Sequence, residues 1–241
     1  MSVAVQQAMV HARGITKRFG RSIALRGIDL DLAAGERVAL FGPNGSGKTT
    51  LLRLLAGLVP PSAGALQVAG RAYSTGGQDI RARIGVVSHH TYLYDDLTGE
   101  ENLLFYGRMF GIGPLRERVA EVLALAGLQA RAGDKVGAYS RGMQQRLALA
   151  RAVIHDPDLL LLDEPETGLD QEASASIDGF LDRLHGSPRT VVMATHDLGL
   201  GHSRCGRFVI LAEGRIACEG RRDEVDPAGL EELYRRGTRR V

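Results

Sequence analysis

The chain has 241 residues, of which 44% are hydrophobic and 24% are charged, and its formal net charge is +2. This length allows one substantial core, or one core with a subdomain, and the nearly balanced charge singles out neither nucleic acid nor an anionic membrane as a partner. We expect no membrane-spanning segment, because no stretch reaches roughly 20 apolar residues, and no secretory signal, because no basic residue precedes an apolar run at the N-terminus.

The first part of the chain predicts strands on both sides of one helix. Apolar runs and alternating patterns predict strands at residues 9–16, 28–32, 37–41, 65–68 and 84–87. A helix is predicted over 50–56, and the Pro-Pro-Ser-Ala-Gly sequence at 60–64 predicts a turn. The strand at 37–41 is short and mostly apolar, which suits a buried position before the helix.

Three helical segments follow without a strand between them. A Thr-x-x-Glu spacing at 98–101 has the form of a capping box and opens an amphipathic helix. Pro114 suits the first turn of a second helix, and Ser140 can cap a third helix over 141–154. This block interrupts the alternation of strands and helices, so we interpret residues 88–156 as an inserted helical subdomain.

Strands and helices alternate again after this block. An uninterrupted apolar run at 159–162 is expected for a parallel strand that is covered on both faces. A helix is predicted over 171–184, a buried strand over 190–194 and a hairpin over 208–218. The tail from 226 is predicted to be helical and becomes basic towards its end.

Residues 42–49 match the pattern G-x-x-x-x-G-K-[ST], a loop that binds nucleotide phosphates between a strand and a helix. Glycines let backbone N–H groups converge on phosphate oxygens, and the positive end of the following helix dipole adds to that attraction. Lys48 would reach the β- and γ-phosphates, and the Thr49 hydroxyl would bind Mg²⁺. The expected nucleotide contacts of this segment are Gly42, Pro43, Asn44, Gly45, Ser46, Gly47, Lys48, Thr49 and Thr50.

Two carboxylates, Asp163 and Glu164, directly follow the predicted strand at 159–162. Ligands of open α/β sheets gather at the carboxyl ends of strands. Asp163 would hold Mg²⁺ through a water molecule, and Glu164 is placed to orient and polarise an attacking water. Phosphoryl transfer needs mainly positioning and charge stabilisation, so these few groups can suffice beside the phosphate loop.

Ser140 and Gly142, at the start of a predicted helix, form a second anion-binding end. One nucleotide needs one phosphate cradle, so a second cradle in the same chain suggests a partner copy. At this point the sequence resembles the ATP-binding subunits of ABC transporters, whose signature is Leu-Ser-Gly-Gly-Gln. Tyr139, Arg141 and Met143 replace the Leu, the first Gly and the Gln. In the family, this segment caps the ATP held by the other subunit of a head-to-tail nucleotide sandwich.

The resemblance implies roles for further residues. Phe19 matches the aromatic position that stacks on adenine, and Asp170 is the acidic residue of a segment that crosses the dimer interface. His196 matches the histidine that contacts the γ-phosphate. The family usually has a Gln that touches Mg²⁺ or its water where this chain has His89, with His90 as the next best match. Imidazole suits Mg²⁺ poorly, so we hypothesise that His89 keeps the coupling role through a water and acquires pH sensitivity near neutrality.

The resemblance covers most of the chain and implies its fold class. We expect an α/β fold, with a phosphate-loop NTPase core of the RecA-like type, an N-terminal antiparallel β subdomain and an inserted α-helical subdomain. The whole chain, 1–241, is then a single ABC ATP-binding domain. Its expected parts are the ATPase core with the β subdomain at 9–87 and 157–225, the helical subdomain at 88–156 and the C-terminal helical tail at 226–241.

The implied function is that of an ATPase that binds ATP with Mg²⁺ and powers export through a separate integral-membrane permease. Its catalytic residues would be Glu164, His196 and Lys48, and its permease contacts would be the loop at 89–96 and the helix after Thr98. A second cassette would complete each ATP site, with a homodimer expected first and a pair of different cassettes left open, and no nucleic acid partner is expected. The protein would be cytoplasmic and peripheral on the inner face of the cell membrane.

Several alternatives stay open. The motifs are similar to the haem exporter ATPase of cytochrome c biogenesis, with drug- or lipid-type exporters close behind. ABC ATPases that act on DNA or ribosomes carry long coiled-coil or zinc insertions, or two cassettes in one chain, and neither feature is found here. A non-ABC phosphate-loop kinase or switch would lack Ser140, Gly142 and His196. Cys205 and Cys218 have no metal-ligand spacing, so we expect buried reduced thiols and a cytosolic location.

Overall fold

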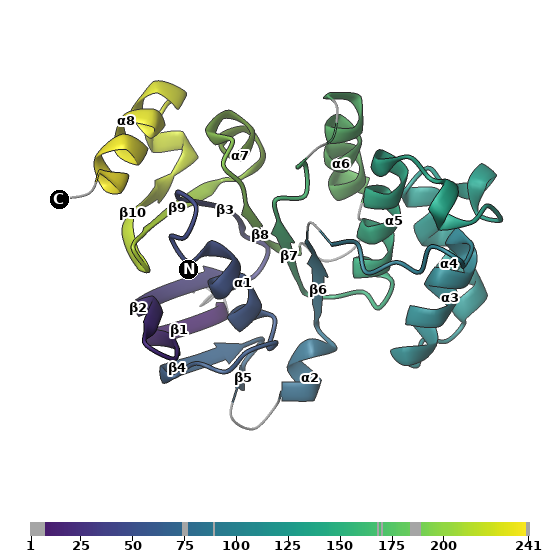
Figure 1. Cartoon of the computed structure of the whole chain (residues 1–241), viewed down its shortest axis with the longest axis horizontal. Coiled ribbons are helices and arrows are strands. Elements are labelled where there is room, and N and C mark those ends of the chain that lie inside the picture. The colour runs from purple at the N-terminus through teal and green to yellow at the C-terminus, as the bar shows by residue number, and fades with distance from the viewer. Residues whose placement is uncertain are drawn as a thin grey trace, which may run out of the picture.

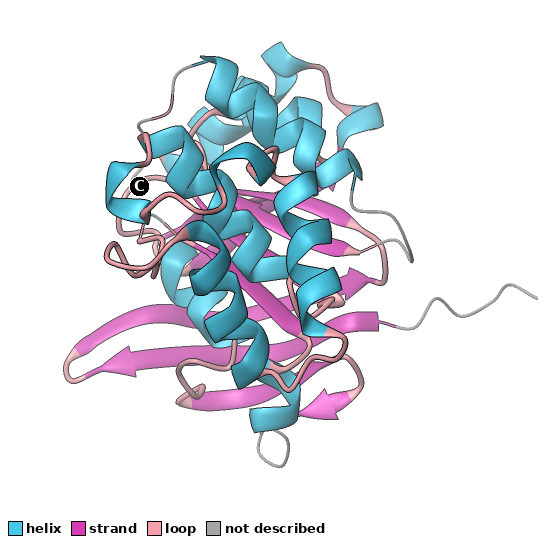
Figure 2. Ribbon diagram, turned by 90° about the vertical axis from the view of Figure 1, so that its right-hand side faces the viewer, coloured by secondary structure: helices cyan, strands magenta, loops and turns pink. Residues whose placement is uncertain are grey.

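The computed structural model describes residues 8–73, 77–88, 90–167, 169, 171–183 and 189–239. These residues form an α/β fold in which an antiparallel sheet, a larger mixed sheet and a lateral group of helices pack together (Figure 1, Figure 2). The fold class is the one expected from the sequence.

The antiparallel sheet has the strand order β2-β1-β4-β5. Its strands are β1 (Ala8–Phe19), β2 (Ser22–Ala33), β4 (Ala63–Val68) and β5 (Arg71–Ala72). β1 and β2 form one hairpin and are longer than the predicted strands at 9–16 and 28–32. The strand ends near the β1–β2 turn were missed because register shifts, such as the one between Lys17 and Arg18, break the alternation of side chains there. Another shift lies between Ala12 and Ile15, where Gly14 has φ of 60°, a conformation that favours glycine.

The larger sheet has the order β10-β9-β3-β8-β7-β6, and all neighbouring strands are parallel except β10 and β9. Its strands are β3 (Arg37–Phe41), β6 (Ile84–Val87), β7 (Leu159–Asp163), β8 (Thr190–Ala194), β9 (Arg207–Ala212) and β10 (Arg215–Arg221). Every residue of β7 and β8 is buried, which confirms the two apolar runs as central strands. Asp163 pairs with Ala194, so β7 and β8 end at the same edge.

The helical block between β6 and β7 contains α3 (Gly99–Met109), α4 (Leu115–Leu125) and α5 (Arg141–Val153), with 3-10 turns at Gln129–Arg131 and Val136–Ala138. Glu101 N donates to Thr98 Oγ1 at 3.1 Å, and Thr98 N donates to Glu101 Oε2 at 2.8 Å, which confirms the capping box. Ser140 Oγ accepts from Met143 N at 3.3 Å and confirms the predicted cap of α5. The block lies beyond the edge strand β6 (Figure 1).

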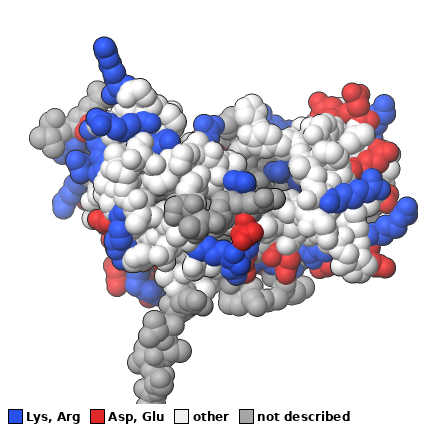
Figure 3. Space-filling view, turned by 90° about the horizontal axis from the view of Figure 1, so that it is seen from below, with Lys and Arg blue, Asp and Glu red and all other residues white. Residues whose placement is uncertain are grey.

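The remaining helices are α1 (Lys48–Leu55), α2 (Gly77–Arg81), α6 (Gln171–Arg183), α7 (Leu198–Arg204) and α8 (Pro227–Thr238), with a 3-10 turn at Arg222–Glu224. The sequence predicted α1, α6 and α8. It did not predict α2 and α7, because five and seven residues are too few to show a helical period. Basic side chains gather at the end of the molecule that carries α8 (Figure 3), where Arg236 Nε pairs with Glu232 Oε1 at 2.5 Å.

Helix α1 lies between the two sheets and so fixes the position of the loop that precedes it. Leu51, Leu54 and Leu55 of α1 share one buried cluster with Val10 of β1 and Val192 of β8. Burial of this apolar surface is the main favourable term that holds the helix there. Within the described residues, no helix combines the length and the apolar character that a bilayer crossing requires.

Candidate nucleotide site

The loop at 42–47 connects β3 to α1 and packs so closely on its neighbours that two of its glycines have no room for a side chain. A Cβ on Gly47 would lie 2.8 Å from Ala24 O of β2, and Gly47 has φ of 110°. A Cβ on Gly42 would collide with the backbone of β9. The loop conformation therefore requires glycine at both positions.

Lys48 is the first residue of α1 and points back across the loop. Its Nζ donates to Gly42 O at 2.6 Å and lies 3.3 Å from Pro43 O. Burial lowers the pKa of Lys48, while the carboxylates of Glu164 and Asp163 favour its charged form. The ammonium group thus contacts the loop carbonyls and lies in the field of two carboxylates, where an incoming phosphate can reach it.

The other loop residues present both a buried hydroxyl and an open surface. Ser46 Oγ is buried and has no hydrogen-bond partner among the described residues, so a phosphate oxygen would satisfy it. Pro43, Asn44 and Gly45 are exposed at the top of the loop. Thr50 was predicted as the first helical residue, but α1 begins two residues earlier and places Thr50 in its first turn.

Thr49 and Asp163 bring together the oxygen donors expected at a magnesium site. Thr49 Oγ1 donates to Asp163 Oδ1 at 3.4 Å, which connects the start of α1 to the end of β7. Asp163 is almost fully buried. A hydroxyl and a carboxylate are hard oxygen ligands of the kind that Mg²⁺ prefers, so these two residues fit the ion.

Glu164 follows Asp163 in the chain, and its side chain faces that of His196, which comes just after the end of β8. Glu164 Oε1 is 3.8 Å from His196 Nδ1, and Glu164 Oε2 accepts a hydrogen bond from Thr167 Oγ1 at 3.1 Å. Glu164 N donates to Ala194 O at 2.9 Å, and its φ of 50° is unusual for a residue with a side chain. The Glu164 side chain is 30% exposed and that of His196 is 65% exposed, so both are accessible to water and ligand.

Three predicted site residues lie outside this cluster. Ser140 and Gly142 are at the start of α5 in the helical block, beyond β6 (Figure 1). Phe19 ends β1, is 51% exposed and lies with its ring centroid 5.0 Å from Lys17 Nζ. An exposed aromatic ring beside a cation is suited to stacking on a planar ligand.

Two predicted site residues, His89 and Asp170, lie outside the described residues. His90, the second match to the family's Gln, is exposed and borders a cavity of about 340 Å³ that Glu164 also lines. Within the described part of the chain, no group of three or more His, Cys, Asp and Glu side chains is arranged to hold a metal ion. The water-mediated role of His89 stays a prediction.

Several contacts around Glu164 were not predicted from the sequence. Arg141 Nη2 donates to Thr167 O at 2.9 Å. The hydroxyl of buried Thr195 donates to Glu166 Oε1 and accepts from Asp197 N at 3.0 Å, which fixes the segment that carries His196. The contacts of Arg141 with Thr167 and of Thr195 with Glu166 join residues far apart in sequence, so no local pattern indicates them.

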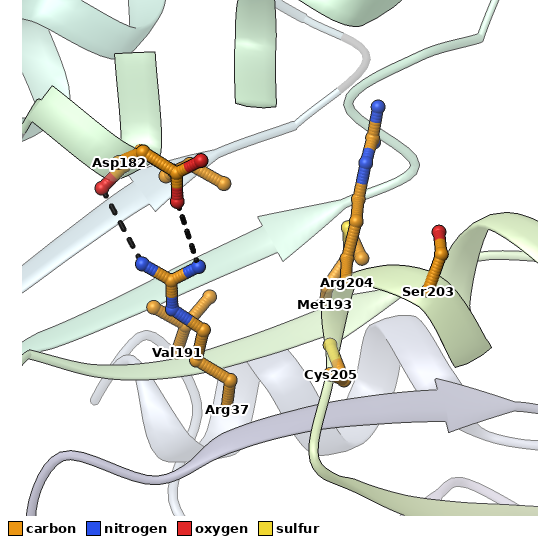
Figure 4. A pocket seen from close by; sticks show the side chains of 8 residues that line it. Arg37, Asp182, Val191, Met193, Ser203, Arg204 and Cys205 are labelled. Carbon is orange, nitrogen blue, oxygen red and sulfur yellow. Dashed lines mark hydrogen bonds and ion pairs between the residues drawn. The ribbon is translucent and has the colours of Figure 1, made fainter. Parts of the chain in front are cut away.

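A second cavity lies at the opposite end of the strands, on the far side from the carboxylates. It has a volume of about 300 Å³ and is lined by the starts of β3 and β8 and by α6 and α7 (Figure 4). Arg37 Nη1 is 3.2 Å from Asp182 Oδ1 there. Cys205 is buried beside it, and burial raises the pKa of its thiol to about 12. Cys205 and Cys218 are both free thiols, but only Cys205 is buried as expected, and Cys218 is half-buried.

A phosphate loop before α1, with two acidic residues at the end of a central strand, defines a phosphate-loop NTPase. Comparison with known proteins gives the family. The sequence profile described as "ABC transporter" matches residues 25–167. The chain is 40% identical over 215 residues to the Nod factor export ATP-binding protein I of Burkholderia lata, covering 88% of this chain and 71% of that protein. It is 34% identical over 219 residues to the linearmycin resistance ATP-binding protein LnrL of Bacillus subtilis, covering 90% and 70%.

Solved structures of ATP-binding cassettes also resemble this chain. A dimeric ATP-binding cassette in a post-hydrolysis state with bound ADP and Pi has a TM-score of 0.79 and 31% identity, covering 88% of this chain and 98% of that chain. The ATP-binding subunit of an ABC transporter has a TM-score of 0.84 and 27% identity, covering 96% and 100%. The chain therefore belongs to the ABC transporter family. It is an ATP-binding cassette that hydrolyses ATP as a subunit of such a transporter.

Proposed function

We propose that this cassette powers export of a small molecule through a separate integral-membrane permease, at the inner face of the membrane. The Burkholderia relative is named for Nod factor export and the Bacillus relative for linearmycin resistance. These names favour a drug-type exporter over haem export for cytochrome c biogenesis, the substrate that the motifs first suggested. The single observation that carries the proposal is the convergence of Lys48, Thr49, Asp163 and Glu164 at one sheet edge.

In this site, the loop N–H groups and Lys48 would bind the β- and γ-phosphates of ATP, and Lys48 would exchange Gly42 O for phosphate oxygens. Glu164 would accept a hydrogen bond from the attacking water and direct its oxygen at the γ-phosphorus. The bond from that phosphorus to the β-phosphate oxygen then breaks, giving ADP and phosphate. His196 would contact the γ-phosphate, and Mg²⁺ bound by Thr49 and Asp163 would neutralise phosphate charge.

Ser140 and Gly142 lie at the start of α5, which is beyond β6 and separate from the phosphate loop before α1 (Figure 1). We propose that they complete the ATP site of a second cassette in a head-to-tail pair. The N-terminus of α5 offers backbone N–H groups and a positive dipole for the partner's γ-phosphate. The dimeric cassette with bound ADP and Pi supports this arrangement.

An exposed apolar surface supports the predicted permease contact. It is formed by Leu58, Tyr92, Tyr94, Phe105, Met109 and Phe110, which we call the aromatic surface. The rings of Tyr94 and Phe105 are 5.1 Å apart, and a cavity of about 330 Å³ opens between Leu58 and Tyr92. Exposed apolar patches of this kind mark protein contacts. The loop after His89 and helix α3, the two segments predicted to contact the permease, supply most of the aromatic surface.

Membrane retention tests the proposal. Met109 is 69% exposed at the end of α3, so Met109→Glu places a charge on the aromatic surface without disturbing the core. We expect wild-type protein on washed native membranes, and about tenfold less of the variant, with ATP hydrolysis by the isolated chain unchanged within about twofold. Arg116→Glu, a charge reversal on the exposed face of α4, is the matched control and should be retained like wild type.

Affinity capture from detergent-solubilised membranes identifies the permease in the same experiment. A permease that co-purifies with wild type and with Arg116→Glu, and is lost with Met109→Glu, supports the proposal. Recovery of the protein in ribosome or nucleoid fractions would instead support the other class of ABC ATPase. Equal membrane retention of Met109→Glu and wild type would show that the aromatic surface is not the docking site.

A further inference from the structure

A chain of contacts connects the start of α5 with the carboxylate proposed to activate water. Arg141 Nη2 donates to Thr167 O at 2.9 Å, and Thr167 Oγ1 donates to Glu164 Oε2 at 3.1 Å. The other carboxylate oxygen, Glu164 Oε1, lies 3.8 Å from His196 Nδ1. Arg141 therefore reaches the Glu164 carboxylate through a single residue.

The position of the Glu164 carboxylate depends on these side-chain contacts. Its backbone is fixed, because Glu164 N donates to Ala194 O at 2.9 Å. Its side chain instead borders a cavity of about 340 Å³ between α5 and the segment after β7, lined also by Arg141, Gln144 and Thr167. The cavity leaves room for other rotamers, so the Thr167 hydroxyl selects one of them.

The contact between Arg141 and Thr167 contributes little to the stability of the fold. Both residues are exposed, and an exposed hydrogen bond of a long side chain contributes little net free energy, because water competes for both partners. The ABC signature has glycine at position 141, so the side chain that makes this contact is a departure of this chain from the family pattern.

We infer that Arg141 is a positioning residue for Glu164, which acts by holding Thr167 so that its hydroxyl aims the carboxylate. This inference rests on the proposed role of Glu164 and on the proposed pairing of two cassettes. In that pair the start of α5 faces the partner's nucleotide, whereas Glu164 serves the nucleotide of its own chain. Arg141 then links the two ATP sites. Its guanidinium borders the partner's nucleotide and, through Thr167, sets the position of the Glu164 carboxylate at the nucleotide of its own chain.

A double-mutant cycle on the full chain tests the link. Arg141→Ala removes the guanidinium, and Thr167→Val keeps the carbonyl that Arg141 contacts but removes the hydroxyl. We expect each variant to lower kcat by about tenfold and to change KM for ATP by less than about twofold, because only the orientation of the Glu164 carboxylate is lost. We expect the double variant to be no slower than the single variants within about twofold, since both act through one contact.

Three controls make the result specific. Arg141→Lys can still donate to Thr167 O, and Thr167→Ser keeps the hydroxyl, so both should retain kcat within about threefold of wild type. Arg146→Ala removes another arginine of α5 that donates to a backbone carbonyl, Ala126 O, and should not change kcat. The Arg141 and Thr167 variants should have the melting temperature of wild type. If any variant melts at a lower temperature, it should be Arg146→Ala.

Two results would overturn the inference: independent, multiplying losses in the double variant, or a rise in KM with unchanged kcat in Arg141→Ala, which would mean that the guanidinium binds nucleotide directly. Glu164→Gln, measured beside the cycle, separates this failure from failure of the proposed function. A fully active Glu164→Gln enzyme would remove the proposed role of Glu164 itself. The dependence of the wild-type rate on protein concentration reports pairing of cassettes independently.

Discussion

Lys48 lies in a place where burial favours the neutral amine and lowers the pKa of the side chain. The carboxylates of Glu164 and Asp163 oppose that effect, and the hydrogen bond to Gly42 O orients the ammonium group in the loop. A triphosphate brings further negative charge to the same point. The phosphate loop is therefore prepared electrostatically for an anion before one binds.

Replacement of Lys48 should damage both binding and turnover. Lys48→Ala should weaken ATP binding by about tenfold or more and lower kcat by about 100-fold or more, because a charge-assisted contact to the β- and γ-phosphates is lost. Titration with a fluorescent ATP analogue measures the first effect, and phosphate release measures the second. Lys48→Arg keeps the charge with a different geometry, so it should bind more tightly than Lys48→Ala. Wild-type affinity in Lys48→Ala would contradict the assignment.

The phosphate-loop residues could be predicted from the sequence because they are consecutive, and their geometry follows from glycine and a helix start. The contacts between residues on different elements of the site could not be predicted from the sequence. His196 faces Glu164 only because Asp163 pairs with Ala194, a register that no local pattern specifies. Arg141 of α5 meets Thr167 O although the two residues are 26 residues apart in the chain. The roles of His89 and Asp170 stay predictions, since both lie outside the described residues.

At the scale of elements, His155 joins three parts of the fold. It follows α5, its ring stacks on Phe110 after α3 with centroids 3.9 Å apart and 7° between planes, and its Nε2 is 3.2 Å from Ile84 O at the start of β6. Burial lowers the pKa of His155 to about 4, from a usual value of 6.5. The helical block is thus tied to the sheet by a histidine that is neutral at physiological pH.

This burial predicts a pH dependence of stability. Below pH 6.5 the unfolded chain binds a proton on His155 while the folded chain does not until about pH 4, so stability is fully present above pH 6.5 and is lost as the pH falls towards 4. The loss should be about 2–3 kcal/mol. Urea unfolding at pH 7 and pH 4.5 measures it. His155→Phe keeps a stacked ring without titration, and its stability should fall less over this interval; an equal fall would contradict the account.

Elements with a complete local signal were predicted, and short or irregular ones were not. Thr98 with Glu101, and Ser140, marked the starts of α3 and α5 because a cap needs only a few adjacent residues. β5, α2 and α7 show too few residues for a period. The hairpin of β1 and β2 was predicted too short because bulges interrupt its alternation.

At the scale of the whole molecule, the order of strands decides where function lies. β3 lies between β8 and β9, two strands that come more than 140 residues later in the chain. The helix that follows the phosphate loop therefore begins near the end of β7, where Thr49 contacts Asp163. The α/β class was evident from the alternation of elements, whereas this strand order was not, because it is set by packing of segments distant in sequence. The same order places α5 beyond β6, away from the loop of its own chain (Figure 1).

That separation is the reason to expect two cassettes around two nucleotides, because Ser140 and Gly142 lie at the start of α5 in the helical block and not beside α1 of their own chain. Glu164→Gln tests this most directly, because it should keep ATP binding and lose the group that activates water. We predict that this variant, given ATP and Mg²⁺, doubles its mass in small-angle scattering and retains intact ATP. A variant that hydrolyses ATP at the wild-type rate, or that encloses ATP as a lone protomer, would contradict the account.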